Sequence, residues 1–207
     1  MKFFFKDLFN VPNSMSLFRL VVTPFLPLCW FVLDSPGLTL AFGLVVGITD
    51  LFDGILARKL NQTTELGALI DQLGDLVFES TCFIIGVADG ELWMGWLILY
   101  LFREFTVTVL RTYVYSNGGT LPSSWIGKAK SSLFQWAFFL LFLGVMLSRP
   151  GTCPPEWQVA GLTPGWALIH GGMLSIVTGF AVSILSGWHY LKAFVAFYIQ
   201  RNADETR

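Results

Sequence analysis

Charged side chains are scarce in this chain. They make up 13% of its 207 residues, whereas hydrophobic residues make up 54%, and the mean hydropathy is +0.63. A soluble domain carries roughly 25% charged residues, so about half that share cannot cover the surface of a soluble globule of this size. The composition therefore excludes an ordinary soluble domain, and the high hydrophobicity also excludes intrinsic disorder.

A basic excess is missing as well. The 13 Lys and Arg residues are balanced by 14 Asp and Glu residues, which gives a net charge of -1. Binding to nucleic acid over a broad surface needs a basic patch or stripe, so we expect no nucleic-acid partner. Cysteine is also rare, and two of the three residues (Cys29, Cys82 and Cys153) lie inside apolar runs, so no disulfide framework is expected.

Long apolar runs dominate what is present. A helix that crosses a membrane needs about 20 mostly apolar residues, and clusters of polar, Pro or Gly residues divide this chain into six such runs. We expect spans at about 17–34, 37–57, 68–88, 91–115, 131–148 and 171–197. The expected fold is an all-α integral membrane protein with six transmembrane helices, and residues 1–207 are expected to form a single membrane domain.

The basic residues predict how these spans are oriented. With the N-terminus inside, only Arg149 falls in an outer loop, together with Asp34 and Asp89. The inner side receives Lys2, Lys6, Arg58, Lys59, Lys128, Lys130, Lys192, Arg201 and Arg207. Cytoplasmic loops collect Lys and Arg, so we expect both ends of the chain in the cytoplasm. This predicts a multi-pass protein of the inner membrane.

Two segments lie outside the predicted spans. Residues 1–12 begin Met-Lys-Phe-Phe-Phe-Lys and are too short to span, so we expect an interfacial amphipathic helix with its Phe rings in the bilayer. A frayed cytoplasmic tail is the alternative interpretation. Residues 149–170 are rich in Pro, Gly and Trp and are expected to form an outer loop. Trp157 and Trp166 in this loop are of the residue type that collects at membrane interfaces.

Acidic residues in the second and third spans are costly in a membrane. By insertion scales, each carboxylate near a helix centre costs on the order of 2.5–3.5 kcal/mol. Their spacing places two groups on one helical face each: Asp50, Asp53, Gly54 and Ala57 in the second span, and Gly67, Asp71 and Asp75 in the third. Because the linker at 58–66 is short and polar, we expect these helices to be antiparallel neighbours whose carboxylates face one crevice.

Carboxylate oxygens in such a crevice suit hard divalent cations, Mg²⁺ or Mn²⁺. The interleaved small residues leave room for a flat ligand or a close backbone approach. One alternative is that the acids are helix-terminal charges that reach water. A second is a cation pathway in a channel or transporter, which explains the carboxylates but not the small residues or Arg58.

The complete motif over residues 50–75 is Asp-x2-Asp-Gly-x2-Ala-Arg-x8-Gly-x3-Asp-x3-Asp. It resembles the signature of the CDP-alcohol phosphatidyltransferases at all eight of its fixed positions, and six spans agree with the fold of that family. The resemblance implies two divalent cations, Mg²⁺ or Mn²⁺, that bind the pyrophosphate of a CDP-linked lipid. The metal ligands would be Asp50, Asp53, Asp71 and Asp75, and the resemblance makes Asp75 the base that takes the proton of the attacking alcohol.

The resemblance also implies how the donor, CDP-diacylglycerol, is bound. Gly54, Ala57 and Gly67 would line the cytidine pocket beside Asp50, and Arg58 would help to neutralise phosphate. The alcohol attacks the β-phosphorus next to the diacylglycerol and CMP leaves, so the products are a phosphodiester lipid and CMP. Family members of this size are often dimers, so a homodimer is implied too.

Weaker patterns resemble the branch of this family whose acceptor is glycerol-3-phosphate. They are Pro12-Asn13-x2-Ser16-x2-Arg19, the linker 57–64, Arg103-Glu104 with Arg111, and the loop 125–130. A phosphate dianion near the membrane surface needs Arg or Lys donors. We expect the acceptor-binding residues to be Arg111, Lys128, Lys130 and Arg103. Contact with lipid headgroups is the alternative for the two lysines, and a buried ion pair, with Glu79 as one partner, is the alternative for Arg103.

Two positions depart from that branch. Many of its enzymes have Pro after the third aspartate and Lys after the fourth, whereas this chain has Gln72 and Leu76. The metal ligands are intact, so the departure concerns the acceptor rather than the type of reaction. Phosphatidylglycerol, inositol and inositol phosphate are the alternative acceptors. A divalent-cation transporter and a non-catalytic membrane scaffold are the alternatives outside the family.

Overall fold

The computed structural model describes residues 11–59, 65–120, 125–150, 152, 154 and 162–205, and the elements formed there are all helices. The predicted all-α fold is therefore confirmed. The expected interfacial helix at residues 1–12 falls almost entirely outside the described residues. The elements are α2 (Val11–Val22), α3 (Phe25–Pro27), the π-helical turn η1 (Leu28–Val32), α4 (Pro36–Lys59), α5 (Glu65–Ala88), α6 (Met94–Ser116), α7 (Trp125–Ser148) and α8 (Pro164–Glu205).

The first predicted span is broken where prolines interrupt it. Pro24 and Pro27 have no backbone N–H, so the regular hydrogen-bond ladder cannot continue through them. The Thr23 backbone N–H and hydroxyl both donate to the Arg19 carbonyl, at 2.9 and 2.8 Å, and close the end of α2. The chain resumes as α3 and then widens into η1, where the Leu33 N–H donates to the Leu28 carbonyl at 3.0 Å.

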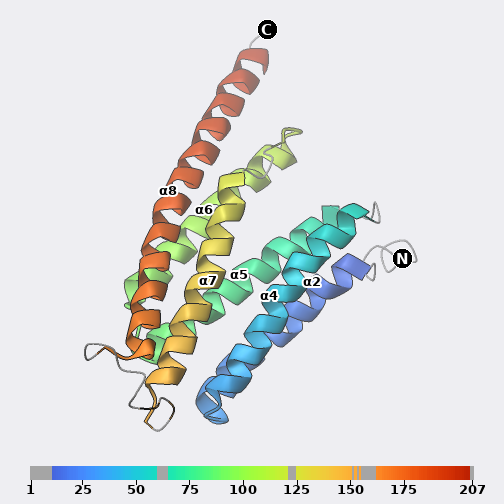
Figure 1. Cartoon of the computed structure of the whole chain (residues 1–207). Helices are drawn as coiled ribbons and strands as arrows, with labels where there is room; N and C mark the ends of the chain where they lie inside the picture. Colours follow the sequence, from blue (N-terminus) through green and yellow to red (C-terminus); the bar gives the residue numbers. More distant parts are fainter. Residues whose placement is uncertain are drawn as a thin grey trace.

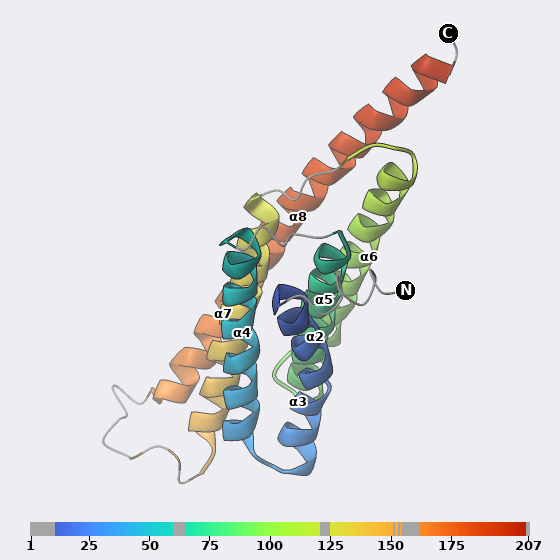
Figure 2. The same cartoon turned by 90° about the vertical axis from the view of Figure 1, so that its right-hand side faces the viewer.

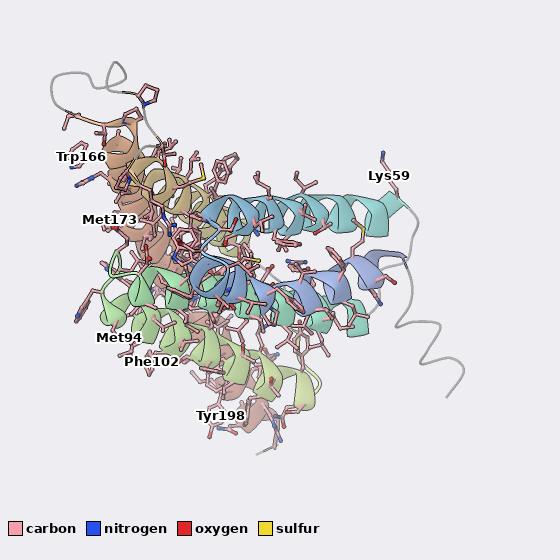
Figure 3. The ribbon with its side chains drawn as sticks, turned by 90° about the horizontal axis from the view of Figure 1, so that it is seen from below. Lys59, Met94, Phe102, Trp166, Met173 and Tyr198 are labelled. Carbon is pink, nitrogen blue, oxygen red and sulfur yellow. The ribbon has the colours of Figure 1, made fainter. Side chains whose placement is uncertain are left out.

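Helix α2 lies between α4 and α5 and packs against both of them (Figures 2 and 3). The expected antiparallel course of α4 and α5 agrees with the structure, but the expectation that they are immediate neighbours is corrected, since over the described residues each packs on α2 instead. The short linker sets the direction of the two helices and not their lateral separation. What draws α2 between them is a buried polar stripe: Asn13, Ser16, Arg19 and Thr23.

Helices α7 and α8 form the closest helix pair, and glycines make the contact (Figure 1). A Cβ at Gly165 would lie 2.7 Å from the Gly144 carbonyl oxygen, and a Cβ at Gly172 would lie 2.8 Å from that of Ala137. Small residues let membrane helices approach backbone to backbone. Gly172 lies inside the predicted span 171–197, and the structure places it within α8, where its missing side chain permits this contact.

Helix α8 begins at Pro164, so residues 164–170 of the expected outer loop are helical. The Thr163 hydroxyl accepts a hydrogen bond from the Trp166 N–H at 3.2 Å, and proline is favoured in the first turn of a helix. Its 42 residues span about 63 Å at 1.5 Å each. Figures 1 and 2 show that α8 runs past the ends of the other helices.

The core is aromatic, and its centre is Phe83 of α5, which is fully buried. The Phe83 ring centroid lies 4.8 Å from that of Phe138, 5.1 Å from that of Tyr100 and 5.6 Å from that of Phe134. These partners come from α6 and α7, and Phe180 of α8 also contacts Phe83 at 6.0 Å. This cluster fixes α5 against the three helices that follow it in the chain.

One end of the bundle is tied by polar contacts between distant segments. Arg149 donates to Asp34 at 2.6 Å, and the Trp30 indole N–H donates to Asp89 at 3.0 Å. The Arg149 guanidinium also lies 5.7 Å from the Trp30 ring centroid. The prediction that positions 34, 89 and 149 lie on the same side of the protein is therefore confirmed.

Among the described residues, three helical segments are long and apolar enough to cross a membrane: Asn13–Val32, Ala129–Ser148 and Pro164–Ala203. Large apolar side chains are widely exposed, including Phe102 at 72% and Trp93 at 71%. Soluble proteins seldom expose contiguous apolar surface, so these features are those of a membrane protein. The acidic stripe of α5 and the charged residues of α6 make those helices less apolar, and the six-span count stays a prediction.

We expect Gly172→Ala to lower the melting temperature in detergent, because its Cβ would also lie 2.9 Å from the backbone nitrogen of Leu141. Overpacking of this kind costs roughly 1–3 kcal/mol. Gly171→Ala is the matched control, since no neighbouring group lies within 4 Å of a Cβ there, and alanine is favoured over glycine in a helix. Equal melting temperatures for the two variants would contradict the assigned role of Gly172.

Candidate active site

The third and fourth aspartates of the motif lie on α5, one helical turn apart. One guanidinium joins them: Arg19 Nη2 donates to Asp71 Oδ1 at 2.7 Å, and Arg19 Nη1 donates to Asp75 Oδ1 at 2.5 Å. The Arg19 side chain is 1% exposed, whereas those of Asp71 and Asp75 are 47% and 31% exposed. The cation is thus buried behind the two carboxylates, and the carboxylates face the open side of the site.

Gly74 lets the guanidinium lie against α5. A Cβ at this position would lie 3.4 Å from Arg19 Nε and 3.7 Å from Arg19 Cδ, so the side chain of Arg19 rests directly on the helix between the two aspartates. The polar stripe of α2 brings Arg19 to this place. In the sequence, the pattern that ends at Arg19 indicates a branch of the family and so an acceptor. It does not indicate that Arg19 contacts Asp71 and Asp75 of α5. The signal that could have found it is the spacing of three and four residues between the polar positions of α2.

Asp71 and Asp75 are suitable ligands for the divalent cations that the motif implies. Their oxygen atoms are of the kind that Mg²⁺ and Mn²⁺ prefer as ligands, and Arg19 donates to Oδ1 of each carboxylate. The side chains of Asp50, Asp53, Gly54, Ala57, Arg58 and Lys128 lie outside the part that the structure describes. Among the side chains that are described, no three acidic, His or Cys residues gather as a metal site, so the four-aspartate site stays a prediction. Gly67 is described, within the first turn of α5.

A polar seam joins α5 to α6 beside the aspartates. Gln72 Nε2 donates to the Thr108 hydroxyl at 3.2 Å, and Gln72 Oε1 accepts from Arg111 Nη1 at 3.5 Å. Arg111 also donates to the hydroxyl of Tyr190 in α8, and its guanidinium carbon lies 4.6 Å from the Tyr190 ring centroid. Of the predicted acceptor residues, Arg111 is thus held next to the acidic stripe, and Tyr190 is a neighbour that the sequence did not indicate.

Lys130 and Arg103 lie in a second charged cluster. Lys130 Nζ is 2.6 Å from Glu104 and 3.5 Å from Glu79, and Arg103 Nη1 is 2.6 Å from Glu104. Arg103 also donates to the Ser186 hydroxyl of α8 at 3.2 Å. Lys130 is 5% exposed and Glu79 is 1% exposed, so this cluster is buried. The acceptor-binding role of Lys130 and Arg103 stays a prediction, since both side chains contact carboxylates here.

Two details of this cluster differ from the sequence-based expectation. Residues 125–130 form the first turns of α7 and not a loop before it. Arg103 pairs with Glu104, the next residue, although adjacent side chains diverge on a helix. The long Arg103 side chain bends to reach Glu104, and Lys130 binds the same Glu104 oxygen from α7. Glu79 pairs with Lys130 instead of Arg103.

An apolar cavity of about 190 Å³ lies between α4 and α7. Gly43 and Gly47 line it from α4, and Trp136 and Phe139 line it from α7. A Cβ at either glycine would meet no neighbouring group within 4 Å, so the glycines keep this space open. Positions 43 and 47 continue along α4 toward the motif at intervals of three and four residues.

Residues 9–177 match the family model of the CDP-alcohol phosphatidyltransferases. This chain belongs to that family. A CDP-diacylglycerol–glycerol-3-phosphate 3-phosphatidyltransferase of Pectobacterium atrosepticum is 31% identical over 141 residues, which cover 64% of this chain and 76% of the relative. The protein of the same name from Escherichia coli strain K12 is 33% identical over 132 residues, which cover 60% and 71%.

The resemblance that the motif predicted is therefore confirmed, and the chain is a transferase of the CDP-alcohol phosphatidyltransferase family. The match spans α2 to the first half of α8, so it includes both the acidic stripe of α5 and the polar seam with α6. The relatives' names give no support to the cation transporter or the scaffold as alternatives.

Replacement of Arg19 by methionine should destabilise the protein, because two charge-assisted hydrogen bonds are lost from a buried position. Hydrogen bonds to charged groups contribute roughly 1.5–3 kcal/mol each. Arg149→Met is the matched control, because it removes an ion pair whose aspartate is 80% exposed, and such pairs contribute only about 0–1 kcal/mol. The melting temperatures of the two variants in detergent measure the two losses of stability. A larger fall for Arg149→Met than for Arg19→Met would contradict the stabilising role of Arg19.

Proposed function

We propose that this protein transfers a phosphatidyl group from CDP-diacylglycerol to glycerol-3-phosphate, with release of CMP. The observation that carries the proposal is the acidic stripe of α5, on which Asp71 and Asp75 lie within hydrogen-bond distance of Arg19 and beside the seam that holds Arg111. Family membership gives the reaction type, and the names of the relatives support this donor and this acceptor.

The proposed metal site consists of Asp50, Asp53, Asp71 and Asp75, and it holds two divalent cations, Mg²⁺ or Mn²⁺. Cations bound there would stabilise negative charge on the attacking and leaving oxygens of the phosphoryl transfer. The buried Arg19 supports the proposal, because it orients one oxygen of each of the two α5 carboxylates. Partners that orient metal-binding carboxylates in this way commonly tune a site.

In the proposed reaction the acceptor hydroxyl oxygen forms a bond to the β-phosphorus, and the bond from that phosphorus to the CMP phosphate oxygen breaks. Asp75 takes the hydroxyl proton, and CMP leaves as the anion. Gly54, Ala57 and Gly67 are proposed to face the cytidine, with Asp50 and Arg58 near its phosphates. The apolar cavity beside Gly43 and Gly47 is consistent with a donor that carries acyl chains.

Arg111 and Lys128 are the proposed acceptor-binding residues. The guanidinium of Arg111 is a planar fork of donors that matches phosphate oxygens. It lies on α6 within one helical turn of Thr108, and both Arg111 and Thr108 contact Gln72 of α5. Lys128 lies in the first turn of α7, two residues before Lys130. Lys130 and Arg103 were predicted to act with them, and their contacts with Glu104 also suit a supporting role.

We also propose that six helices cross the inner membrane, with both ends of the chain and the active site on the cytoplasmic side. Three segments with the length and apolarity of a span support this arrangement. So does the polar tie of Asp34 with Arg149 just before Pro36, where α4 begins, because Lys59 ends that helix at its other end (Figure 3). A homodimer is part of the same proposal.

The acceptor is tested by a panel assay on the purified protein in detergent. CDP-diacylglycerol is offered with glycerol-3-phosphate, inositol, inositol phosphate, serine or phosphatidylglycerol, and the lipid products are identified by mass spectrometry. We expect phosphatidylglycerophosphate from glycerol-3-phosphate at the highest kcat/KM. A higher kcat/KM with another alcohol would contradict the assignment of glycerol-3-phosphate and identify that alcohol as the acceptor.

We expect Asp75→Asn to reduce CMP release by roughly 10²–10⁴-fold, the usual contribution of a positioned base. Asp89→Asn is the matched control, because that carboxylate lies at the opposite end of α5 and can still accept from Trp30 through its amide oxygen. If Asp75→Asn releases CMP as fast as the wild-type protein, Asp75 is not the base of the reaction.

EDTA should abolish CMP release by the wild-type protein, because the carboxylate site needs its cations, and added Mg²⁺ or Mn²⁺ should restore it. The readout is CMP formation over time at a fixed CDP-diacylglycerol concentration. Activity that persists in excess EDTA would contradict the metal-dependent mechanism.

A further inference from the structure

Gln72 is placed differently from the aspartates that flank it. Because it follows Asp71 directly, it points to another face of α5, and its side chain reaches α6. The Thr108 hydroxyl accepts a hydrogen bond from the amide N–H of Gln72 at 3.2 Å, so the amide oxygen of Gln72 faces Arg111. Gln72 therefore links the acidic stripe to the guanidinium of Arg111 through a neutral group.

Arg111 differs from the other described arginines inside the bundle in the charge of its partners. Arg19 and Arg103 each contact a carboxylate, whereas Arg111 forms no ion pair within the described part of the chain. Its contacts are the amide of Gln72 and the hydroxyl and ring of Tyr190, which is 5% exposed. These groups fix the guanidinium in place and leave its charge uncompensated.

One donor of Arg111 also lacks a partner. Its Nε atom is buried and forms no hydrogen bond within the described residues. A buried donor without a partner is unfavourable and calls for an explanation, and a bound ligand that accepts from it is one. A guanidinium with uncompensated charge and an unused N–H is suited to a phosphate, which accepts several hydrogen bonds from a planar donor fork.

We infer that Gln72 and Tyr190 are positioning residues that hold Arg111 for the phosphate of the acceptor, and that the neutral charge of Gln72 is what makes Arg111 available to that phosphate. The inference rests on the proposed function. Gln72 lies between Asp71 and Asp75 in α5, so a phosphate at Arg111 is bound beside the proposed base. A carboxylate at position 72 would pair with Arg111 and compete with the acceptor.

The decisive variant is Gln72→Glu, which keeps the shape of the side chain and adds one negative charge. We expect it to raise the KM for glycerol-3-phosphate about tenfold or more, while the KM for CDP-diacylglycerol changes less than about twofold. Tyr190→Phe keeps the ring and removes the hydroxyl that accepts from Arg111, and we expect a rise of about threefold in the same KM.

The matched control pair is Thr108→Val and Thr106→Val on α6. Thr108 accepts from Gln72, whereas Thr106 donates only within its own helix, to the Phe102 carbonyl at 2.7 Å. Thr108→Val should raise the acceptor KM and Thr106→Val should not. A second readout is protection by inorganic phosphate, which should raise the melting temperature of the wild-type protein more than that of Gln72→Glu.

The outcomes distinguish a failure of the proposed function from a failure of the positioning role of Gln72 and Tyr190. If wild-type protein makes no product from glycerol-3-phosphate in the panel assay, the proposed function fails. If it does, but Gln72→Glu changes the two KM values equally or not at all, the proposed function stands and the positioning role is overturned. Should Gln72→Glu fail to fold in detergent, Tyr190→Phe and the threonine pair decide the question by the same ratio of KM values.

Discussion

The contact of Arg19 with Asp71 and Asp75 is the interaction on which the arrangement of the site depends. Two carboxylates one turn apart on a helix repel each other, and in a membrane protein they also lose the water that would screen them. The buried Arg19 guanidinium donates to both carboxylates and compensates one of their two negative charges. Helix α2, which carries that guanidinium, packs against both α4 and α5.

The same rule of charge compensation orders the neighbouring helices. Lys130 lies between Glu104 and Glu79 and close to the rings of Tyr100 and Phe134, at 5.5 and 5.7 Å, so a cation, two carboxylates and the aromatic core are packed as one unit. Arg111 departs from this rule, since its partners are neutral. Among the described residues, Arg19, Arg103 and Lys130 each contact a carboxylate, whereas Arg111 is held by an amide and a phenol.

Much of the fold could be predicted because it depends on local patterns. The apolar runs located each helix, and the spacing of Asp71 and Asp75 placed them correctly on one face of α5. Lateral packing could not be predicted, because the short linker after α4 constrains direction alone, and α2 lies between α4 and α5. The packing role of Gly172 could not be predicted either, because a glycine inside an apolar run carries no sign of the backbone that its missing side chain allows to approach. Gln72 contacts Thr108, which is 36 residues away, and Tyr190 contacts Arg111, which is 79 residues away. The periodicity of the sequence carries no information about contacts over such separations, so these two roles could not be predicted.

The glycine contact between α7 and α8 determines where this bundle can yield. At Gly144, Gly165 and Gly172 the two helices approach backbone to backbone, and further along the pair the Phe134 and Phe180 rings pack with centroids 5.3 Å apart. The surface between α4 and α7 is the opposite case, since it already encloses an unfilled apolar space and is bridged by side chains with free torsions. The α7–α8 pair is therefore expected to move as one unit, and separation of helices within the bundle is expected at the contact between α4 and α7, where the cavity leaves fewer atoms in contact.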